Sequence, residues 1–227
     1  MNMPEMNTGG WVFDRDSCYL DLMIEFQAQW KAMDEHFAVV GLVVTGSNPG
    51  NGEVLEFAAL HVDPSGMVNA EFSALVSLKQ PVLDFVLQEA GVTPEEVDRL
   101  GRPLAEAMTD LLDFLGSRPV FIHDAELAMP FLRHAGEEAR RTFASPLHDT
   151  LTMALLTWPE IDSHRIWDLA KFVDAPETGD QLTDDLKVIL AVLQAAWIVA
   201  YREDDERQAS RECPDWATVS PDSSPLD

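Results

Sequence analysis

The sequence has 227 residues, 46% hydrophobic and 24% charged, so it can form one large domain or two small ones. This composition excludes a wholly disordered or fibrous protein. The net charge is unusual: 40 acidic and 15 basic residues give −25 at pH 7. Such a surface repels phosphate backbones and anionic lipids, so we expect weak or no nucleic-acid binding and no membrane association.

Neither a membrane span nor an export signal is apparent in the sequence. The longest apolar run, Val188–Tyr201, is interrupted by Gln194 and is too short to cross a bilayer. Residues 1–10 lack the basic region and apolar core of a signal peptide. Cys18 and Cys213 lie near opposite ends and form neither a disulfide framework nor a metal-ligand spacing. We therefore expect a cytoplasmic protein.

Residues 1–37 are predicted to be an N-terminal extension containing an amphipathic helix, from Ser17 to Phe37. Its apolar positions recur at steps of three and four residues, which is the helical period: Leu20, Met23, Phe26, Trp30 and Met33. We expect this apolar face to pack on the domain. The alternative is that it is exposed and forms a homodimer interface.

Three strands joined by short turns are predicted next. Phe37–Thr45 is continuous, β-branched and uncharged, which is typical of a strand buried on both faces. Glu53–Val62 and Val68–Leu78 alternate in part, and the turn residues Asp63–Gly66 between them indicate a hairpin. The sheet therefore begins with consecutive strands.

The chain then alternates between helical and short apolar segments, which predicts a single α/β domain over residues 38–201. Beyond it, residues 202–227 are acidic and rich in Ser and Pro, and we predict a flexible tail. The expected strands are Pro119–His123 and Pro146–Asp149. The expected helices are Val82–Ala90, Pro94–Leu100, Pro103–Leu115, Ala125–Ala135, Thr150–Leu156, a helix capped by Ser163 and continuing to Lys171, and Gln181–Tyr201.

Seven short fragments stand in order at Gly41–Gly46, Leu55–Ala59, Phe114–Gly116, His123–Leu132, Asp149–Leu151, Ser163–Lys171 and Asp180–Leu186. In this order and spacing they resemble the DEDD exonuclease superfamily, and most closely its epsilon-type branch with a histidine in the third motif. The corresponding family segments are Asp-x-Glu-Thr-Thr-Gly, Ile-Glu-Ile-Ala-Ala, Phe-Leu-Gly, His-Asn-Ala, Asp-Thr-Leu, Ser-His and His-x-x-x-x-Asp. The resemblance implies a ribonuclease-H-like α/β fold, a mixed five-stranded sheet flanked by helices, with the N-terminal helix added.

The same resemblance implies that the catalytic residues are largely lost. Family members hold two divalent metals with four carboxylates, which here fall at Gly41, Val43, Ala128 and Asp185. Only Asp185 keeps a carboxylate, as a vestigial catalytic residue. The general-base histidine is replaced by Asp180, which has no imidazole. No metal or other cofactor is therefore expected, and Mg²⁺ or Mn²⁺ enters only if the protein is active.

Other polar residues beside these motifs allow two interpretations. Asp124, Glu126 and Asp184 could be displaced ligands for one cation, but acids are also favoured in the first turn of a helix. His123 ends a strand and is expected to hydrogen-bond locally; a surviving contact to substrate is the alternative. Glu56 lies among apolar strand residues and is expected to pair with a neighbour.

Three functional hypotheses follow. The first is a catalytically degenerate exonuclease homologue that acts by binding a protein partner, whose identity the sequence does not give. The second is a residual or altered metal-dependent 3′–5′ exonuclease acting on single strands through displaced carboxylates. The third is an acidic decoy that occupies the nucleic-acid-binding surface of another protein.

Overall fold

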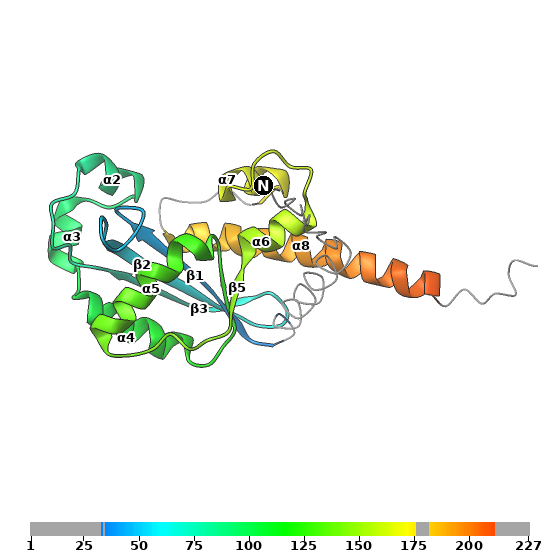
Figure 1. The fold of residues 1–227 in the computed structure, drawn as a ribbon, viewed down its shortest axis with the longest axis horizontal. Coiled ribbons are helices and arrows are strands. Elements are labelled where there is room, and N and C mark those ends of the chain that lie inside the picture. Colours follow the sequence, from blue (N-terminus) through cyan, green and yellow to red (C-terminus); the bar gives the residue numbers. More distant parts are fainter. Residues whose placement is uncertain (1–32, 34, 176–181, 212–227) are drawn as a thin grey trace, which may run out of the picture.

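A mixed five-stranded sheet forms the centre of the computed structural model, which describes residues 33, 35–175 and 182–211 (Figure 1). The strand order is β3-β2-β1-β4-β5. The first three strands pair antiparallel, and β4 and β5 run parallel to β1. The strands are β1 (Phe37–Val44), β2 (Val54–Val62), β3 (Val68–Leu75), β4 (Val120–Ile122) and β5 (Leu147–Asp149). The predicted mixed sheet is confirmed.

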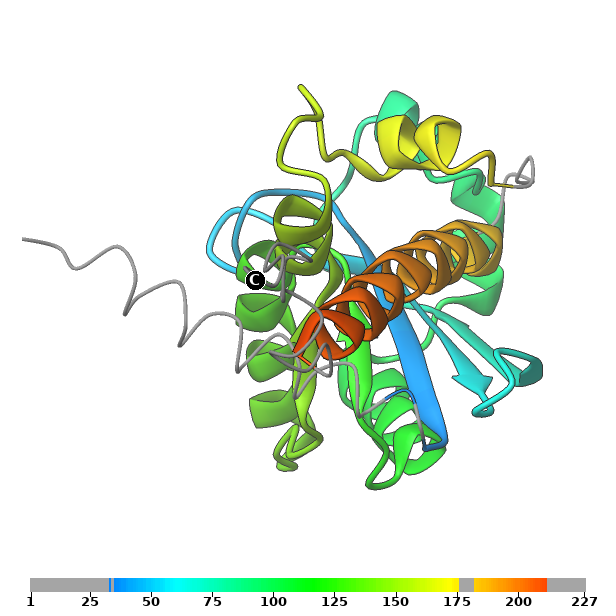
Figure 2. The same cartoon turned by 90° about the vertical axis from the view of Figure 1, so that its right-hand side faces the viewer.

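Helices cover both faces of this sheet. Figure 2 shows α8 crossing the sheet obliquely on one side. One layer contains α4 (Leu104–Leu115) and α5 (Ala125–Ala139), and the other contains α6 (Thr150–Thr157), α7 (Ile166–Phe172) and α8 (Leu182–Arg211). Two short helices, α2 (Asp84–Glu89) and α3 (Pro94–Leu100), lie where β1 ends and β2 begins (Figure 1).

The strand β1 is buried between the two layers, as its continuous apolar sequence predicts. Alternate side chains of a strand point to opposite faces, so Ala38 and Val40 pack with α4 and α5, whereas Val39 packs with the α6–α8 layer. All three are fully buried. The odd-numbered positions of β1 therefore face α8, which decides where Gly41 and Val43 point.

Local sequence signals set the helix boundaries near α3 and α4. Helix α3 starts after Thr93, whose hydroxyl accepts a hydrogen bond from Glu96 N at 3.2 Å. The Glu96 carboxylate in turn accepts from Thr93 N at 2.9 Å, which completes a capping box. Helix α4 ends at Leu115 and is followed by Gly116, whose φ of 61° is readily adopted by glycine. Both predicted helices are confirmed.

Two predicted helices have different ends in the structure. The predicted cap at Ser163 is wrong: α7 begins at Ile166 after Arg165, and Ser163 Oγ instead donates to Asp168 Oδ2 at 2.6 Å. Helix α5 continues past Ala135 to Ala139, and it ends where Arg140 adopts φ 54°.

Helix α8 is longer than expected and runs to Arg211, so the flexible tail predicted from residue 202 is wrong for residues 202–211. Its remainder, 212–227, lies outside the described residues, as do residues 17–32 and 34 of the predicted N-terminal helix. Phe37, the last residue of that predicted helix, starts β1. No helix among the described residues is long and apolar enough to cross a membrane.

Candidate functional site

The site implied by the motifs is centred on Gly41 of β1, on the side that faces α8. A Cβ atom added to Gly41 would come within 2.6 Å of Leu186 Cδ2 and 3.4 Å of Leu182 Cδ1. Leu186 is fully buried and Leu182 is 9% exposed. The space into which a side chain at position 41 would project is therefore filled by apolar side chains from the first turns of α8.

Val43 lies on the same side of β1 and is also in apolar surroundings. It packs against the α6–α8 layer and against a small cluster made by Leu55, Leu87 and Val97. Two neighbouring positions of β1 thus contribute to the core. Neither offers an oxygen atom, the ligand type that Mg²⁺ and Mn²⁺ prefer.

Asp185 is half-buried in the first turn of α8, next to Leu186. Burial raises the pKa of its carboxyl to about 6, and the negative charges of Asp184 and Glu56 add to this effect. The Asp184 carboxylate is held by Lys187, whose Nζ lies 3.2 Å from Asp184 Oδ1 and 3.4 Å from Glu71 Oε1. Asp184 is therefore engaged in a local ion-pair network.

Glu56 is the buried acidic residue of this region, at 7% exposed. It pairs with Val43 across the β1–β2 ladder. Its Oε1 accepts a hydrogen bond from Ser73 Oγ at 2.7 Å, so the expected pairing with a neighbour is confirmed. Burial nevertheless raises the pKa of its carboxyl. The sequence motifs did not indicate that the negative charge of Glu56 raises the pKa of Asp185. The effect depends on the register of β1 with β2, which positions Glu56.

The second motif lies across the sheet from Leu186. Ala128 on α5 is 4% exposed and belongs to the apolar cluster formed with α4. Asp124 has φ 62° and caps α5, with Oδ1 accepting from Leu127 N at 3.2 Å. Glu126 is exposed in the first turn. Both acids stand where helix-terminus electrostatics favours them.

His123 hydrogen-bonds with a residue distant in sequence and not locally as expected: its Nδ1 lies 3.1 Å from Thr150 Oγ1. Burial lowers the pKa of its imidazole, although the Asp149 carboxylate opposes this effect. Asp149, which sequence reasoning did not select as a site residue, links the N-terminal ends of α5 and α6. Its Oδ1 accepts from the backbone N–H groups of Asp124, Ala125 and Leu151, and its Oδ2 from Thr152 Oγ1.

The described residues do not fit a metal centre of the family type. Among residues 33, 35–175 and 182–211, no three His, Cys, Asp or Glu side chains lie close enough together to hold a metal ion. The position of the first motif carboxylate is covered by leucine, and Asp180 lies outside the described residues. Hard divalent cations need several oxygen ligands, which this arrangement does not supply.

A hollow lies beside the far end of β1. A cavity of about 430 Å³ is bordered by Thr45, the turn that follows it, the segment Lys79–Leu83, and α5. Its rim carries an ion pair between Lys79 Nζ and Glu138 Oε1 at 2.7 Å. Gly41, Val43, Ala128 and Asp185 do not line this cavity.

The sheet order, the helix layers and the order of the motifs define a ribonuclease-H-like domain of the exonuclease type. No protein-family model matches the chain. Two solved structures share the fold. Escherichia coli exonuclease I in complex with a dT13 oligonucleotide has a TM-score of 0.60 and 17% identity, over 76% of this chain and 43% of that one. Exonuclease X in complex with 5′ overhanging duplex DNA has a TM-score of 0.56 and 17% identity, over 70% and 90%.

Sequence relatives give the same assignment. DNA polymerase III subunit epsilon of Aquifex aeolicus is 23% identical over 172 residues, 73% of this chain and 84% of that protein. DNA polymerase III PolC-type of Clostridium perfringens is 21% identical over 166 residues, 72% of this chain but 11% of PolC. The chain is a homologue of the DEDD exonuclease superfamily and has its ribonuclease-H-like fold.

Proposed function

We propose that this chain is a catalytically degenerate exonuclease homologue that acts by binding a protein partner. One observation supports the loss of catalysis most directly: Leu186 and Leu182 occupy the space beside Gly41. A metal-dependent exonuclease of this family needs carboxylates there to hold the ions that activate water and stabilise the reacting phosphate. The apolar side chains of Leu182 and Leu186 provide no negative charge for a metal ion and leave no space for one.

The partner is expected to present a basic surface. The net charge of −25 favours association with positively charged proteins and disfavours nucleic acid. Complex formation should therefore weaken steeply as salt is raised. If the partner is itself a nucleic-acid-binding protein, single-stranded nucleic acid should compete with this chain for the partner. Such competition would distinguish the decoy hypothesis from binding at another surface of the partner.

An exonuclease assay tests the loss of catalysis. Purified full chain is incubated with a labelled single-stranded oligonucleotide in Mg²⁺ or Mn²⁺, alongside Asp185→Asn and the matched surface variant Asp162→Asn. We expect no release of mononucleotides above background from any of them. Release that Asp185→Asn abolishes and Asp162→Asn leaves intact would overturn the proposal and establish the residual exonuclease.

A further inference from the structure

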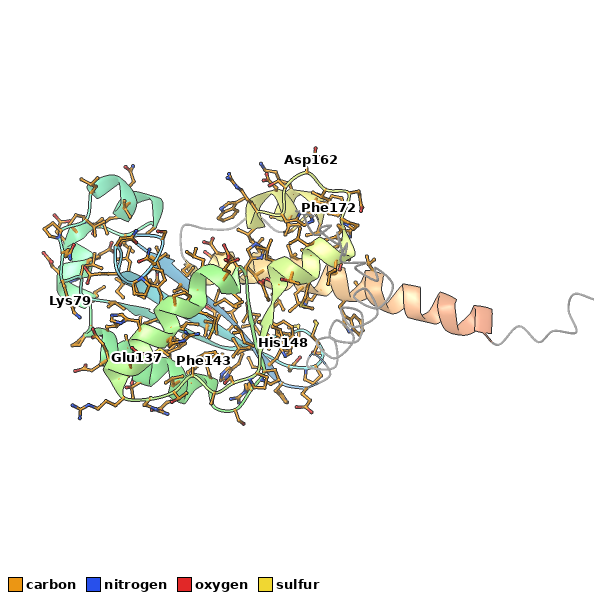
Figure 3. The ribbon with its side chains drawn as sticks, viewed as in Figure 1. Lys79, Glu137, Phe143, His148, Asp162 and Phe172 are labelled. Carbon is orange, nitrogen blue, oxygen red and sulfur yellow. The ribbon has the colours of Figure 1, made fainter. Side chains whose placement is uncertain are left out.

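Strand β3 forms one edge of the sheet, and in the described part of the chain no strand lies on its outer side (Figure 1). It has 8 residues, whereas β5 at the opposite edge has 3, with His148 (labelled in Figure 3) in the middle. An exposed edge strand can pair with another chain, and proteins commonly protect such edges with Pro or Lys. The sequence of β3, VNAEFSAL, contains neither.

The backbone groups on the outer side of β3 belong to Asn69, Glu71 and Ser73, whose side chains are exposed. Successive residues of a strand direct their N–H and C=O groups to opposite sides. Val76 N donates to Leu55 O of β2 at 2.8 Å, so residues 70, 72 and 74 bond to β2 and the residues between them face outward. No hydrogen bond to these outward groups occurs among the described residues. We refer to them as the β3 edge.

The chain itself shows that this side accepts a backbone partner. Just beyond the β3 edge, Leu75 O accepts from Arg102 N and Ser77 N donates to Arg102 O, both at 2.9 Å. Arg102 thereby forms an isolated parallel bridge and occupies that end of the outer side. An added strand is therefore restricted to the three residues of the β3 edge.

This restriction makes a second copy of the chain a poor partner. Two β3 edges that pair antiparallel through all three residues place Asn69 opposite Ser73, and Glu71 opposite its own counterpart. Like charges directly opposite each other destabilise a sheet. The net charge of −25 on each chain adds to the repulsion. The edge therefore favours a different chain, with positive charge.

The side chains beside the β3 edge indicate what that chain carries. On the side facing α8, Glu71 Oε1 lies 3.4 Å from Lys187 Nζ, which is also 3.2 Å from Asp184 Oδ1. Two carboxylates thus share one ammonium group. On the side facing α4, the ring of Phe72 lies 5.5 Å from that of Phe114. Because alternate side chains of a strand point to opposite sides, a matching segment has a basic residue opposite Glu71 and apolar residues next to it.

We propose that the β3 edge binds an extended segment of a partner protein, which adds to the sheet as an antiparallel strand and carries a basic residue opposite Glu71. Backbone hydrogen bonds hold such a strand, and its alternate side chains give specificity. This inference rests on the proposed binding of a protein partner, and it names the surface and the conformation in which the partner binds.

Amide hydrogen exchange of the full chain, followed by NMR, tests whether the β3 edge is open. The amides of Asn69, Glu71 and Ser73 should exchange at least about a hundredfold faster than those of residues 70, 72 and 74, which bond to β2. Equal protection of the two sets would overturn the proposal, because another segment would then cover the edge.

A synthetic peptide tests the binding itself. It has lysine at its centre, valine on either side and threonine at both ends. Added in excess to the labelled full chain at low salt, it should shift the amide signals of the β3 edge more than those of residues 70, 72 and 74. N-methylation of the central lysine removes the N–H that donates to Glu71 O and should abolish these shifts. Glutamate in place of lysine should weaken binding about three- to tenfold.

Two variants at one position separate backbone pairing from charge. Glu71→Pro removes an N–H that does not bond to β2 and should abolish peptide binding. Glu71→Ala keeps that N–H and should weaken binding about two- to fivefold. The N-methylated peptide tests the same pairing in the unaltered protein.

Two further results would overturn the proposal. One is a set of shifts that is absent from the β3 edge or unchanged by N-methylation. The other is a wild-type mass of two chains in light scattering that falls to one chain in Glu71→Pro, because this would assign the edge to a second copy. Failure of the proposed function has a different signature, the release of mononucleotides that Asp185→Asn abolishes.

Discussion

Two regions that carry motif residues differ sharply in this structure: the surroundings of Gly41 and the end of β5. Around Gly41, the positions of metal ligands are filled by Leu182 and Leu186. At the end of β5, the side chain of the motif residue Asp149 accepts four hydrogen bonds from neighbouring residues. The first region is packed with apolar side chains, whereas the second holds a carboxylate that links the ends of two helices.

Physical chemistry explains why these regions behave differently. Carboxylates gathered for a metal repel one another and raise one another's pKa when the metal is absent, so apolar replacements relieve the fold of that cost. A carboxylate that caps helix ends stabilises the fold with or without metal, because the backbone N–H groups it accepts from have no other intrahelical partner. The comparison therefore separates positions that pack the apolar core from a carboxylate that holds helix ends in place.

The largest effect is expected from restoring the first carboxylate. Gly41→Asp places a charged side chain against fully buried Leu186 and should cost about 3–5 kcal/mol in the free energy of unfolding. Urea denaturation measures this loss. Adding Leu186→Ala should relieve the steric part but not the burial of charge. An unchanged midpoint for Gly41→Asp would mean that leucine does not fill the site.

The next effect concerns the region that keeps its polar network. Asp149→Ala leaves three backbone N–H groups and the Thr152 hydroxyl without their acceptor and should cost about 2–3 kcal/mol. Asp149→Asn keeps an acceptor oxygen and should lose less. The same urea series measures both. Equal, small losses in the two variants would remove the contrast drawn above.

The pH dependence of stability tests the carboxyl of Asp185 in the first turn of α8. The pKa of Asp185 is raised to about 6 in the folded protein, so the folded state holds this proton more tightly than the unfolded chain. The stabilisation is present at low pH and is lost as the pH rises through about 6. For this half-exposed carboxyl we expect about 1 kcal/mol after allowing for solvent screening. The difference in unfolding free energy between wild type and Asp185→Asn, measured at pH 4.5 and 7.5, should change by that amount and in that direction.

The smallest effect distinguishes a helix cap from a displaced ligand. Asp124→Asn keeps both a side-chain acceptor and a residue type tolerant of φ 62°, so stability should change by less than about 0.5 kcal/mol. Asp124→Ala removes the cap and should cost about 1 kcal/mol. Mn²⁺ should not alter the melting temperature of wild type or either variant. Stabilisation of wild type by Mn²⁺ that Asp124→Asn weakens would instead identify Asp124 as a ligand.

Local patterns were enough to predict most of the elements. The apolar run of β1 and the hairpin turn at Asp63–Gly66 act through neighbours in sequence, so these elements can be predicted without knowledge of the fold. The Ser163 prediction failed because its hydroxyl bonds to Asp168 instead of starting the helix. The predicted boundary at residue 202 failed because α8 continues to Arg211 through an acidic stretch that composition alone assigned to the tail.

The sequence by itself determined the order of strands and helices and the absence of carboxylates at Gly41, Val43 and Ala128. Only the tertiary structure decided which side chains occupy the space beside these positions. The contact of Leu186 with Gly41 joins residues far apart in the chain, and the influence of Glu56 on Asp185 depends on the register of β1 with β2. Motif spacing records which side chains are missing, but the packing of α8 across the sheet determines whether the space they leave is open or filled.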